Sequence, residues 1–474
     1  MKRIFILFLI CISEIYAYKI PSGPRLREIV VEKYRDPVYG DSIIIGGTTG
    51  SQQALGGEVG RILCYEFNYV TPENDFKQEW IHPDNSTWNW SQADAWFTYM
   101  KKCKSYYGRE IEILRMHCPI GPQCSPWARD DSRTPTELDT NMTQFLRAIC
   151  QKYNDSTQIK YMDVVNETAV EGSWHKDKPG IPDWECPWYK IGLDTFQLPE
   201  GKLIIPKYIT KAFQIANEYA PDIKLIYNHH EDPTNSSWTL IKKTISHLID
   251  NLGLRVDGIG WQAHVDVGWE KNSNNLTALR NLIDWAHSKG LEFHITEASV
   301  WIKTGATPEN FEKQAVTYRA ILDILLEKRF TGKVGWNTWN IQDDFGWHIE
   351  WYPSLFNGAD SNYSAKPAYY AIQSALLGQG IEEPIENIST LKLYNSPNPF
   401  SGKTTIFFDL PKRGFVSLKI YNLAGEEIKT LLSGNMEIGS YKIEWIPQEV
   451  PQGIYLVYLI QENLIAKQKL ILVK

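Results

Sequence analysis

Two glutamates stand directly after short runs of strand-forming residues, and their positions suggest acid–base chemistry. The stretch from Asp163 to Glu167 reads Asp-Val-Val-Asn-Glu, and the stretch from Leu291 to Glu297 ends in Ile-Thr-Glu, so the second glutamate follows the first by 130 residues. A carboxyl group at the end of a buried strand is held rigidly and is partly desolvated, as a catalytic acid requires. Two such groups are the minimum equipment for cleaving a glycosidic bond by double displacement.

Each glutamate alone has an ordinary structural explanation, because an Asn-Glu pair after a strand is commonly a helix cap or a solvated loop residue. A lone histidine such as His117 or His264 is likewise more often a satisfied core or loop residue than a ligand. Polar and aromatic residues nevertheless recur after the predicted strands, which favours one shared site. They are Glu73, Asn74, Lys77, His117, Asn166, Asn228, Gln262, His264, Trp339 and Trp347.

The elements that must position these residues alternate along the chain. Apolar, β-branched or aromatic runs predict strands at residues 42–45, 63–69, 112–116, 161–165, 224–227, 258–262, 292–296 and 334–339. Apolar residues at helical spacing predict helices between them, for example at residues 208–219, 276–289 and 308–328. Eight alternations predict an α/β fold, a parallel (β/α)8 TIM barrel, in which the chemistry lies at the carboxyl ends of the strands.

Length and composition predict a large barrel and a smaller second domain. Residues 1–17 are typical of an export signal, because Lys2 and Arg3 precede a short apolar run and Ala17 is a plausible cleavage point. We expect the barrel at residues 18–378 and a linker at residues 379–392. Residues 393–474 show short alternating strands, which predict a small all-β sandwich.

The composition also limits the possible partners and cofactors. The net charge of −7 without a long basic run argues against nucleic acid binding. The 18 tryptophans suit stacking on sugar rings as well as core packing. Six cysteines follow the export signal, an even number that permits disulfides, and Cys118 and Cys124 could close a small loop. No Cys-x-x-Cys pair or histidine cluster accompanies them, so we expect no metal and no cofactor.

Residues from about 40 to 376 resemble glycoside hydrolase family 10, the family of endo-β-1,4-xylanases. The likeness lies in the stretches Tyr69 to Lys77, Asp163 to Glu167, Gly258 to His264, Ile295 to Glu297 and Lys366 to Tyr369. The resemblance implies that Glu297 is the nucleophile and Glu167 the acid/base of a retaining enzyme acting on a xylan-type polysaccharide. It also implies that Asn166 binds the sugar 2-hydroxyl and that His264 orients Glu297, with Gln262 near the same point.

Three departures from the family pattern fall near the substrate. Gly121 stands where the family usually has a tryptophan after its third-strand histidine, and Asn228 is followed by His229 and His230 in place of Asp-Tyr. Ser299 replaces an aspartate that helps to hold the sixth-strand histidine, so the tautomer of His264 is open, although another acid could replace it. These departures put the substrate in more doubt than the mechanism.

Residues from about 393 to 474 resemble the C-terminal sorting domain of the type IX secretion system. Ser396 to Phe400, Ile420 to Gly425, Gly453 to Tyr455 and the closing Lys467 to Lys474 carry this likeness. It implies a secreted or cell-surface protein that uses the type IX secretion machinery, and we expect a monomer. A carbohydrate-binding module is the rival interpretation, but the single tryptophan of this region, Trp445, lies in an alternating strand and is expected to pack inward.

Two other functions remain open at this stage. The protein could be a retaining barrel glycosidase acting on another β-linked plant or algal polysaccharide, which the loss of the third-strand tryptophan favours. It could instead be a non-catalytic surface glycan-binding protein, although both carboxyl groups are present.

Overall fold

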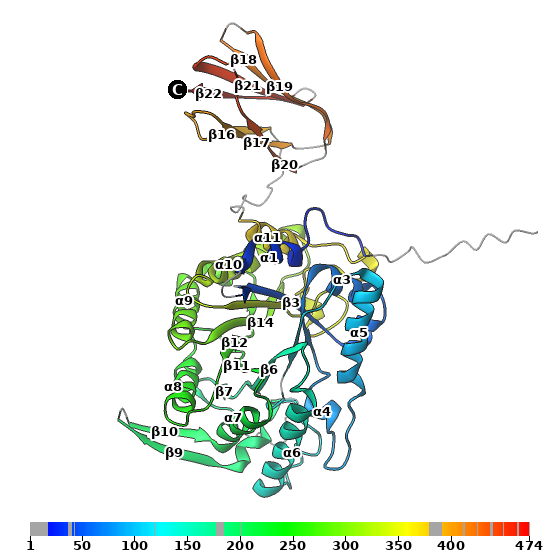
Figure 1. Ribbon diagram of the computed structural model, residues 1–474, viewed down its shortest axis with the longest axis vertical. Helices are drawn as coiled ribbons and strands as arrows, with labels where there is room; N and C mark the ends of the chain where they lie inside the picture. Colours follow the sequence, from blue (N-terminus) through cyan, green and yellow to red (C-terminus); the bar gives the residue numbers. More distant parts are fainter. Residues whose placement is uncertain are drawn as a thin grey trace, which may run out of the picture. The chain divides into compact units, whose positions relative to one another are not determined.

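The computed structural model describes residues 18–36, 40–41, 43–117, 119–176, 184–199, 201–378, 391–410, 413–423, 425–436, 439–448, 450–461 and 464–473 (Figure 1). The chain divides into two compact units, with the division between residues 381 and 382. The predicted export signal at residues 1–17 and almost all of the predicted linker at residues 379–392 lie outside the described residues. In the described part of the chain, no helix is both long and apolar enough to cross a membrane.

The first unit is a closed barrel of eight parallel strands, as predicted. Each strand pairs with the next along the chain, and the last pairs with the first, where Val334 lies beside Ile43. The barrel strands are β3 (Ile43–Thr49), β4 (Tyr69–Pro72), β5 (Ile113–Met116), β6 (Ile159–Asn166), β11 (Lys224–His229), β12 (Gly258–Trp261), β14 (Glu292–Trp301) and β15 (Val334–Thr338).

Helices surround the barrel (Figure 1). Their apolar faces repeat at helical spacing: α6, for example, buries Leu138, Met142 and Phe145, and it begins with a capping box between Thr134 and Glu137. The helices are α1 (Leu26–Tyr34), α2 (Ser51–Leu55), α3 (Glu58–Glu66), α4 (Gln78–Ile81), α5 (Ser91–Tyr107), α6 (Pro135–Tyr153), α7 (Lys207–Tyr219), α8 (Ser237–Asp250), α9 (Ser273–Ser288), α10 (Pro308–Lys328) and α11 (Pro367–Leu376).

One predicted strand is wrong. Residues 63–66 are the end of α3, and the second barrel strand begins only at Tyr69. Val59, Ile62, Leu63 and Glu66 are buried at helical spacing, so this run lies against the barrel as a helix. A short apolar run does not distinguish a buried strand from a buried helical turn.

Additional elements lie in the loops. The loop after β6 carries the hairpin β7 (Ala169–Val170) and β8 (Ser173–Trp174), the 3₁₀ helix η2 (Pro187–Ile191), and the hairpin β9 (Leu193–Leu198) and β10 (Gly201–Pro206). Strand β13 (His264–Asp266) pairs in parallel with the far end of β14. The remaining short elements are β1 (Arg35–Asp36), β2 (Gly40–Asp41), η3 (Trp269–Lys271), η4 (Ile349–Trp351) and η5 (Ala359–Ser361).

The second unit consists of two antiparallel sheets that share a core. One sheet has the order β16-β17-β20 and the other β19-β18-β21-β22. Ile406, Leu418 and Val457 are buried between them, and Trp445 packs inward against Phe400, as predicted. The strands are β16 (Lys392–Ser396), β17 (Thr404–Leu410), β18 (Gly414–Asn422), β19 (Glu427–Met436), β20 (Gly439–Trp445), β21 (Gly453–Gln461) and β22 (Leu464–Leu472).

Candidate active site

Glu167 lies one residue beyond β6 with an unusual backbone conformation. Its φ is 55°, in the left-handed region that residues with a Cβ adopt at a cost. The backbone N–H of Glu167 donates to the carbonyl of Asn228 on the neighbouring strand at 3.2 Å. The end of β11 therefore fixes the turn that directs the Glu167 side chain.

Glu297 lies inside a strand and not at its end. Strand β14 continues to Trp301, and its pairing with β15 changes register between Ile295 and Ala298. The backbone N–H of Glu297 donates to the carbonyl of Gln262, which belongs to the segment after β12. The irregular pairing leaves Glu297 at the barrel mouth while the strand runs on past it.

Three side chains surround the carboxylate of Glu297, which is only 4% exposed. Asn228 donates from Nδ2 to Oε1 at 2.8 Å, and Nε2 of His264 lies 3.3 Å from Oε2. Nδ1 of His117 lies 3.8 Å from Oε1. Burial acts to raise the pKa of Glu297, but the charge of His117 and the hydrogen bond from His264 outweigh it and hold the pKa below its ordinary value. Glu297 is therefore ionised in the free protein near neutral pH.

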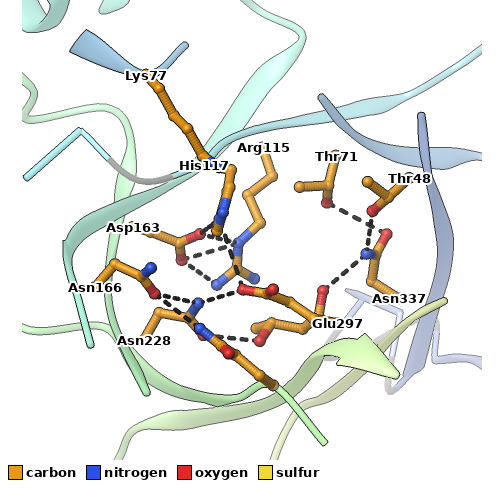
Figure 2. Close-up of polar contacts among 12 residues, drawn as sticks. Thr48, Thr71, Lys77, Arg115, His117, Asp163, Asn166, Asn228, Glu297 and Asn337 are labelled. Atoms are coloured by element: carbon orange, nitrogen blue, oxygen red, sulfur yellow. Dashed lines mark hydrogen bonds and ion pairs between the residues drawn. The ribbon is translucent and has the colours of Figure 1, made fainter. Parts of the chain in front are cut away.

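A chain of three amides joins the two carboxyl groups, and Figure 2 shows its part from Asn166 through Asn228 to Glu297. Gln262 donates from Nε2 to Oε1 of Glu167 at 2.7 Å and also to Oδ1 of Asn166 at 3.2 Å. Asn228 donates from the same Nδ2 to Oδ1 of Asn166, at 2.8 Å, and to Glu297. Because both of these bonds occupy Oδ1 of Asn166, its Nδ2 group is left to donate elsewhere.

A buried ion pair lies behind His117 (Figure 2). Arg115 on β5 donates from Nε to both carboxylate oxygens of Asp163 on β6, at 2.9 and 3.0 Å. Nδ1 of His117 lies 3.0 Å from Oδ2 of Asp163. Burial acts to raise the pKa of Asp163, but Arg115 and His117 outweigh it and lower the pKa, so a fixed negative charge orients His117 beside Glu297.

A pocket of about 920 Å³ opens above the two carboxyl groups. All of the predicted site residues line it except Asn228, which is fully buried beneath them. The side chain of Asn228 is enclosed by Asn166, Thr296 and Glu297, so it lies behind the pocket lining, and its predicted contact with substrate stays a prediction. Trp339 is buried in the wall of the pocket, whereas Trp347 is 45% exposed at its rim.

The residues after β4 form one end of the pocket. Lys77 donates from Nζ to Oδ1 of Asn74 at 2.8 Å and also contacts Gln123. Burial raises the pKa of Glu73, against the opposing charges of Lys77 and His117. This end of the pocket therefore presents both donors and acceptors suited to hydroxyl groups.

Among the described residues, no acid pairs with Nδ1 of His264 where Ser299 replaces the family's aspartate. Nδ1 of His264 is buried and has no hydrogen-bond partner among the described residues. The imidazole instead stacks on Trp301, with ring centroids 5.7 Å apart and planes within 4° of parallel. These contacts favour a hydrogen on Nε2, which faces Oε2 of Glu297 and can donate to it.

Trp184, His230 and Trp301 also line the pocket. Sequence reasoning missed the two tryptophans and noted His230 only as a departure from the family pattern. Burial, followed by the neighbouring charge of His229, lowers the pKa of His230 to about 3, so this imidazole is neutral. Sequence reasoning also missed the buried pair of Arg115 and Asp163 behind His117, and the signal for it was two charged residues inside runs predicted to be buried strands.

None of the cysteines that the structure describes lines the pocket. Cys64, Cys103, Cys124 and Cys150 are buried thiols outside any disulfide. Cys118, whose spacing from Cys124 would permit a small disulfide loop, lies outside the described residues. In the ranges that the structure describes, no three His, Cys, Asp or Glu side chains are grouped so as to hold a metal ion.

A parallel barrel with two carboxyl groups at the mouth of a polar and aromatic pocket defines the class of barrel glycoside hydrolases. Residues 36–375 match the model of Glycosyl hydrolase family 10, and the chain belongs to this family.

The most similar relatives include xylanases. Endo-1,4-beta-xylanase A of Caldicellulosiruptor saccharolyticus is 30% identical over 356 residues, which cover 70% of this chain and 93% of that protein. The crystal structure of native xylanase 10B from Thermotoga maritima is 27% identical with a TM-score of 0.58, and the match covers 75% of this chain and 98% of that one. A mutant structure in complex with xylotriose is 25% identical with a TM-score of 0.58, covering 74% of this chain and 99% of that one.

The second unit has its own family match. Residues 392–474 match the secretion system C-terminal sorting domain. This is the sorting domain of the type IX secretion system, so the protein is directed to the cell surface or beyond.

Proposed function

We propose that the protein is a retaining endo-β-1,4-xylanase in which Glu297 is the nucleophile and Glu167 the acid/base. The observation that carries this proposal is the contrast between two carboxyl groups in one pocket. Glu297 accepts hydrogen bonds from Asn228 and His264 and has a lowered pKa, whereas Glu167 accepts one from the neutral amide of Gln262. Pairs of titratable groups in unlike environments take unlike acid–base roles.

The reaction then proceeds in two steps. In the first, the ionised Glu297 attacks the anomeric carbon while Glu167 gives its proton to the departing oxygen. In the second, Glu167 takes a proton from water, and that water displaces the sugar from Glu297. The covalent bond consumes the charge of Glu297, which changes the proton affinity of Glu167 between the two steps.

The amide chain positions both groups for this sequence. Asn166 lines the pocket, and its Oδ1 is occupied by two donors, so its Nδ2 group could donate to the 2-hydroxyl of the sugar. That hydrogen bond would strengthen as positive charge develops on the ring. Glu73, Asn74, Lys77 and His117 would bind hydroxyls of the next sugars, with Trp339 and Trp347 as walls. Xylan is favoured because relatives over most of the barrel are named xylanases.

A polysaccharide panel tests the proposal. We expect the chain from residue 18 to release reducing sugar from xylan, and we expect the first-formed products to keep the β-configuration in a proton NMR time course. β-Glucan, mannan and cellulose complete the panel, since His230 lines the pocket where the family resemblance leads us to expect a tyrosine. Activity on one of these polymers alone would favour the second candidate function, a related glycosidase. Xylan binding without any sugar release would favour a glycan-binding protein.

A further inference from the structure

The first described residue, Tyr18, belongs to the core of the barrel unit. It is 3% exposed, its ring packs against Tyr65 and Phe356, and its hydroxyl donates to Oε1 of Glu66 at 2.5 Å. The same carboxylate of Glu66 binds Arg25 and Tyr369. The first residues of a domain are usually poorly ordered unless something ties them down. Here an aromatic side chain and a shared buried carboxylate tie the segment to α3 and α11.

The backbone nitrogen of Tyr18 has an acidic partner of its own. It donates to Oε2 of Glu58 at 2.7 Å. Glu58 is the first residue of α3, where the helix dipole favours a negative charge, and its side chain is 31% exposed. Arg61 lies 3.6 Å from the same oxygen. The carboxylate of Glu58 therefore lies beside the nitrogen that would be a positively charged terminal amine in a chain beginning at Tyr18.

We propose that the bond between Ala17 and Tyr18 is a processing site and that Glu58 binds the α-ammonium group which its cleavage creates at Tyr18. A signal-peptidase-type endopeptidase would add one water across this peptide bond. Hydrolysis leaves a carboxylate on Ala17 of the released segment and an amine on Tyr18 of the mature chain. This amine takes up a proton from solvent and becomes the ammonium group. Because Tyr18 is buried in the folded barrel, cleavage precedes folding and the new terminus is enclosed as the barrel forms.

An ammonium group binds this carboxylate more strongly than the amide N–H does. The amide offers one neutral donor, whereas the ammonium offers three donors and a charge, and charge-assisted hydrogen bonds are about twice as strong as neutral ones. Processing would therefore stabilise the mature fold relative to any form that extends beyond Tyr18.

The proposal also predicts a dependence on pH. Pairing with Glu58 raises the pKa of the terminal amine above its unfolded value of about 7.7–8.0. The added stability is then fully present below that value and is lost as the pH rises through the folded pKa. The other charged and titratable groups near this point include Lys19, Arg25, Arg61, Tyr65, Glu66, Tyr107, Tyr363 and Tyr369.

A thermodynamic cycle on the full mature chain tests this directly. One form begins at Tyr18 with a free amine, and the other carries a single added glycine before Tyr18; each is made with Glu58 and with E58Q. With Glu58 present, we expect the glycine to lower Tm by about 1–3 °C at pH 7. In E58Q the two forms should melt together, and above about pH 9 the Glu58 forms should converge. Xylan cleavage at 25 °C should not change, because Glu58 lies outside the site.

Two results would overturn the proposal. The first is a glycine effect on Tm that is equal in the Glu58 and E58Q chains, or absent from both. The second is an exported protein whose N-terminal sequence does not begin at Tyr18. The variant E58D, which keeps the charge, is the matched control and should retain part of the glycine effect.

Discussion

The two catalytic carboxyl groups proposed here differ in how the barrel holds them. Glu297 lies within β14 and is surrounded by Asn228, His264 and His117. Glu167 lies beyond the end of β6 in a left-handed conformation, and Gln262 is the side chain that donates to its carboxyl group. We call the surroundings of Glu297, with three polar side chains, the closed side, and those of Glu167, with one donor, the open side. The difference suggests that the barrel stabilises a negative charge at Glu297 and holds Glu167 through fewer contacts.

The largest loss of activity should come from replacing Glu297, the carboxylate of the closed side. Glu297→Gln keeps the shape of the side chain but removes the nucleophile and its charge, so we expect xylan cleavage to fall by about 10⁴-fold or more. Reducing-sugar release measures this, and circular dichroism checks that the barrel remains folded. Cleavage close to the wild-type rate would refute the assignment of Glu297.

Replacing Glu167, the carboxyl group of the open side, should give a smaller loss of activity, and the size of this loss should depend on the substrate. Glu167→Ala deletes general acid–base catalysis, which contributes about 10²–10⁴-fold. We expect a loss of that size on xylan but a much smaller loss in the first step on an aryl xyloside, because an activated phenol departs without a proton. Burst kinetics of phenol release measure that step. An equal loss on both substrates would contradict the role of Glu167.

The fold and the rim of the site could be predicted because both follow from local patterns. Alternating strand and helix runs predicted the barrel, and the residue after each strand identified the pocket lining. The register between strands could not be predicted in this way. Asn228 follows the same pattern as Gln262, yet it lies below the pocket because its strand, β11, runs on to His229.

The deeper contacts depend on strand length and pairing. Arg115 and Asp163 meet across β5 and β6 only because the register shifts between Leu114 and Arg115. Trp301 reaches His264 because β14 continues past Glu297, a length that the sequence pattern does not specify. Likewise, nothing in the sequence around Tyr18 shows that it is buried, since Glu58 and Glu66 lie far along the chain.

The link between the two sides can be broken at Asn228. Asn228→Ala removes the donor shared by Asn166 and Glu297 and leaves Oδ1 of Asn166 with one donor. One buried hydrogen bond to a charged group is worth about 1.5–3 kcal/mol, so we expect kcat/KM to fall by about 10–100-fold. Asn217→Ala is the matched control, because Asn217 bonds Phe213 and Arg255 away from the pocket. It should lower Tm and leave kcat/KM unchanged; equal losses of activity would contradict a specific role for Asn228.

The lowered pKa of Glu297 predicts that kcat/KM on xylan is maintained below pH 4.5, the ordinary pKa of glutamate, and falls only as Glu297 gains a proton.

The smallest effect, a shift in this pH profile, should come from Ser299, where the surroundings of Glu297 depart from the family pattern. Ser299→Asp would place a carboxylate beside the unpartnered Nδ1 of His264. His264 would then carry hydrogen on both nitrogens, and its positive charge would lower the pKa of Glu297 further. We expect the acid limb of the pH profile to move to lower pH by less than about one unit. Ser299→Asn offers an acceptor without the charge and should move the limb less. An acid limb that moved to higher pH in Ser299→Asp would contradict this prediction. It would show that the added negative charge raises the pKa of Glu297 directly, and that His264, stacked on Trp301, gains nothing from the new carboxylate.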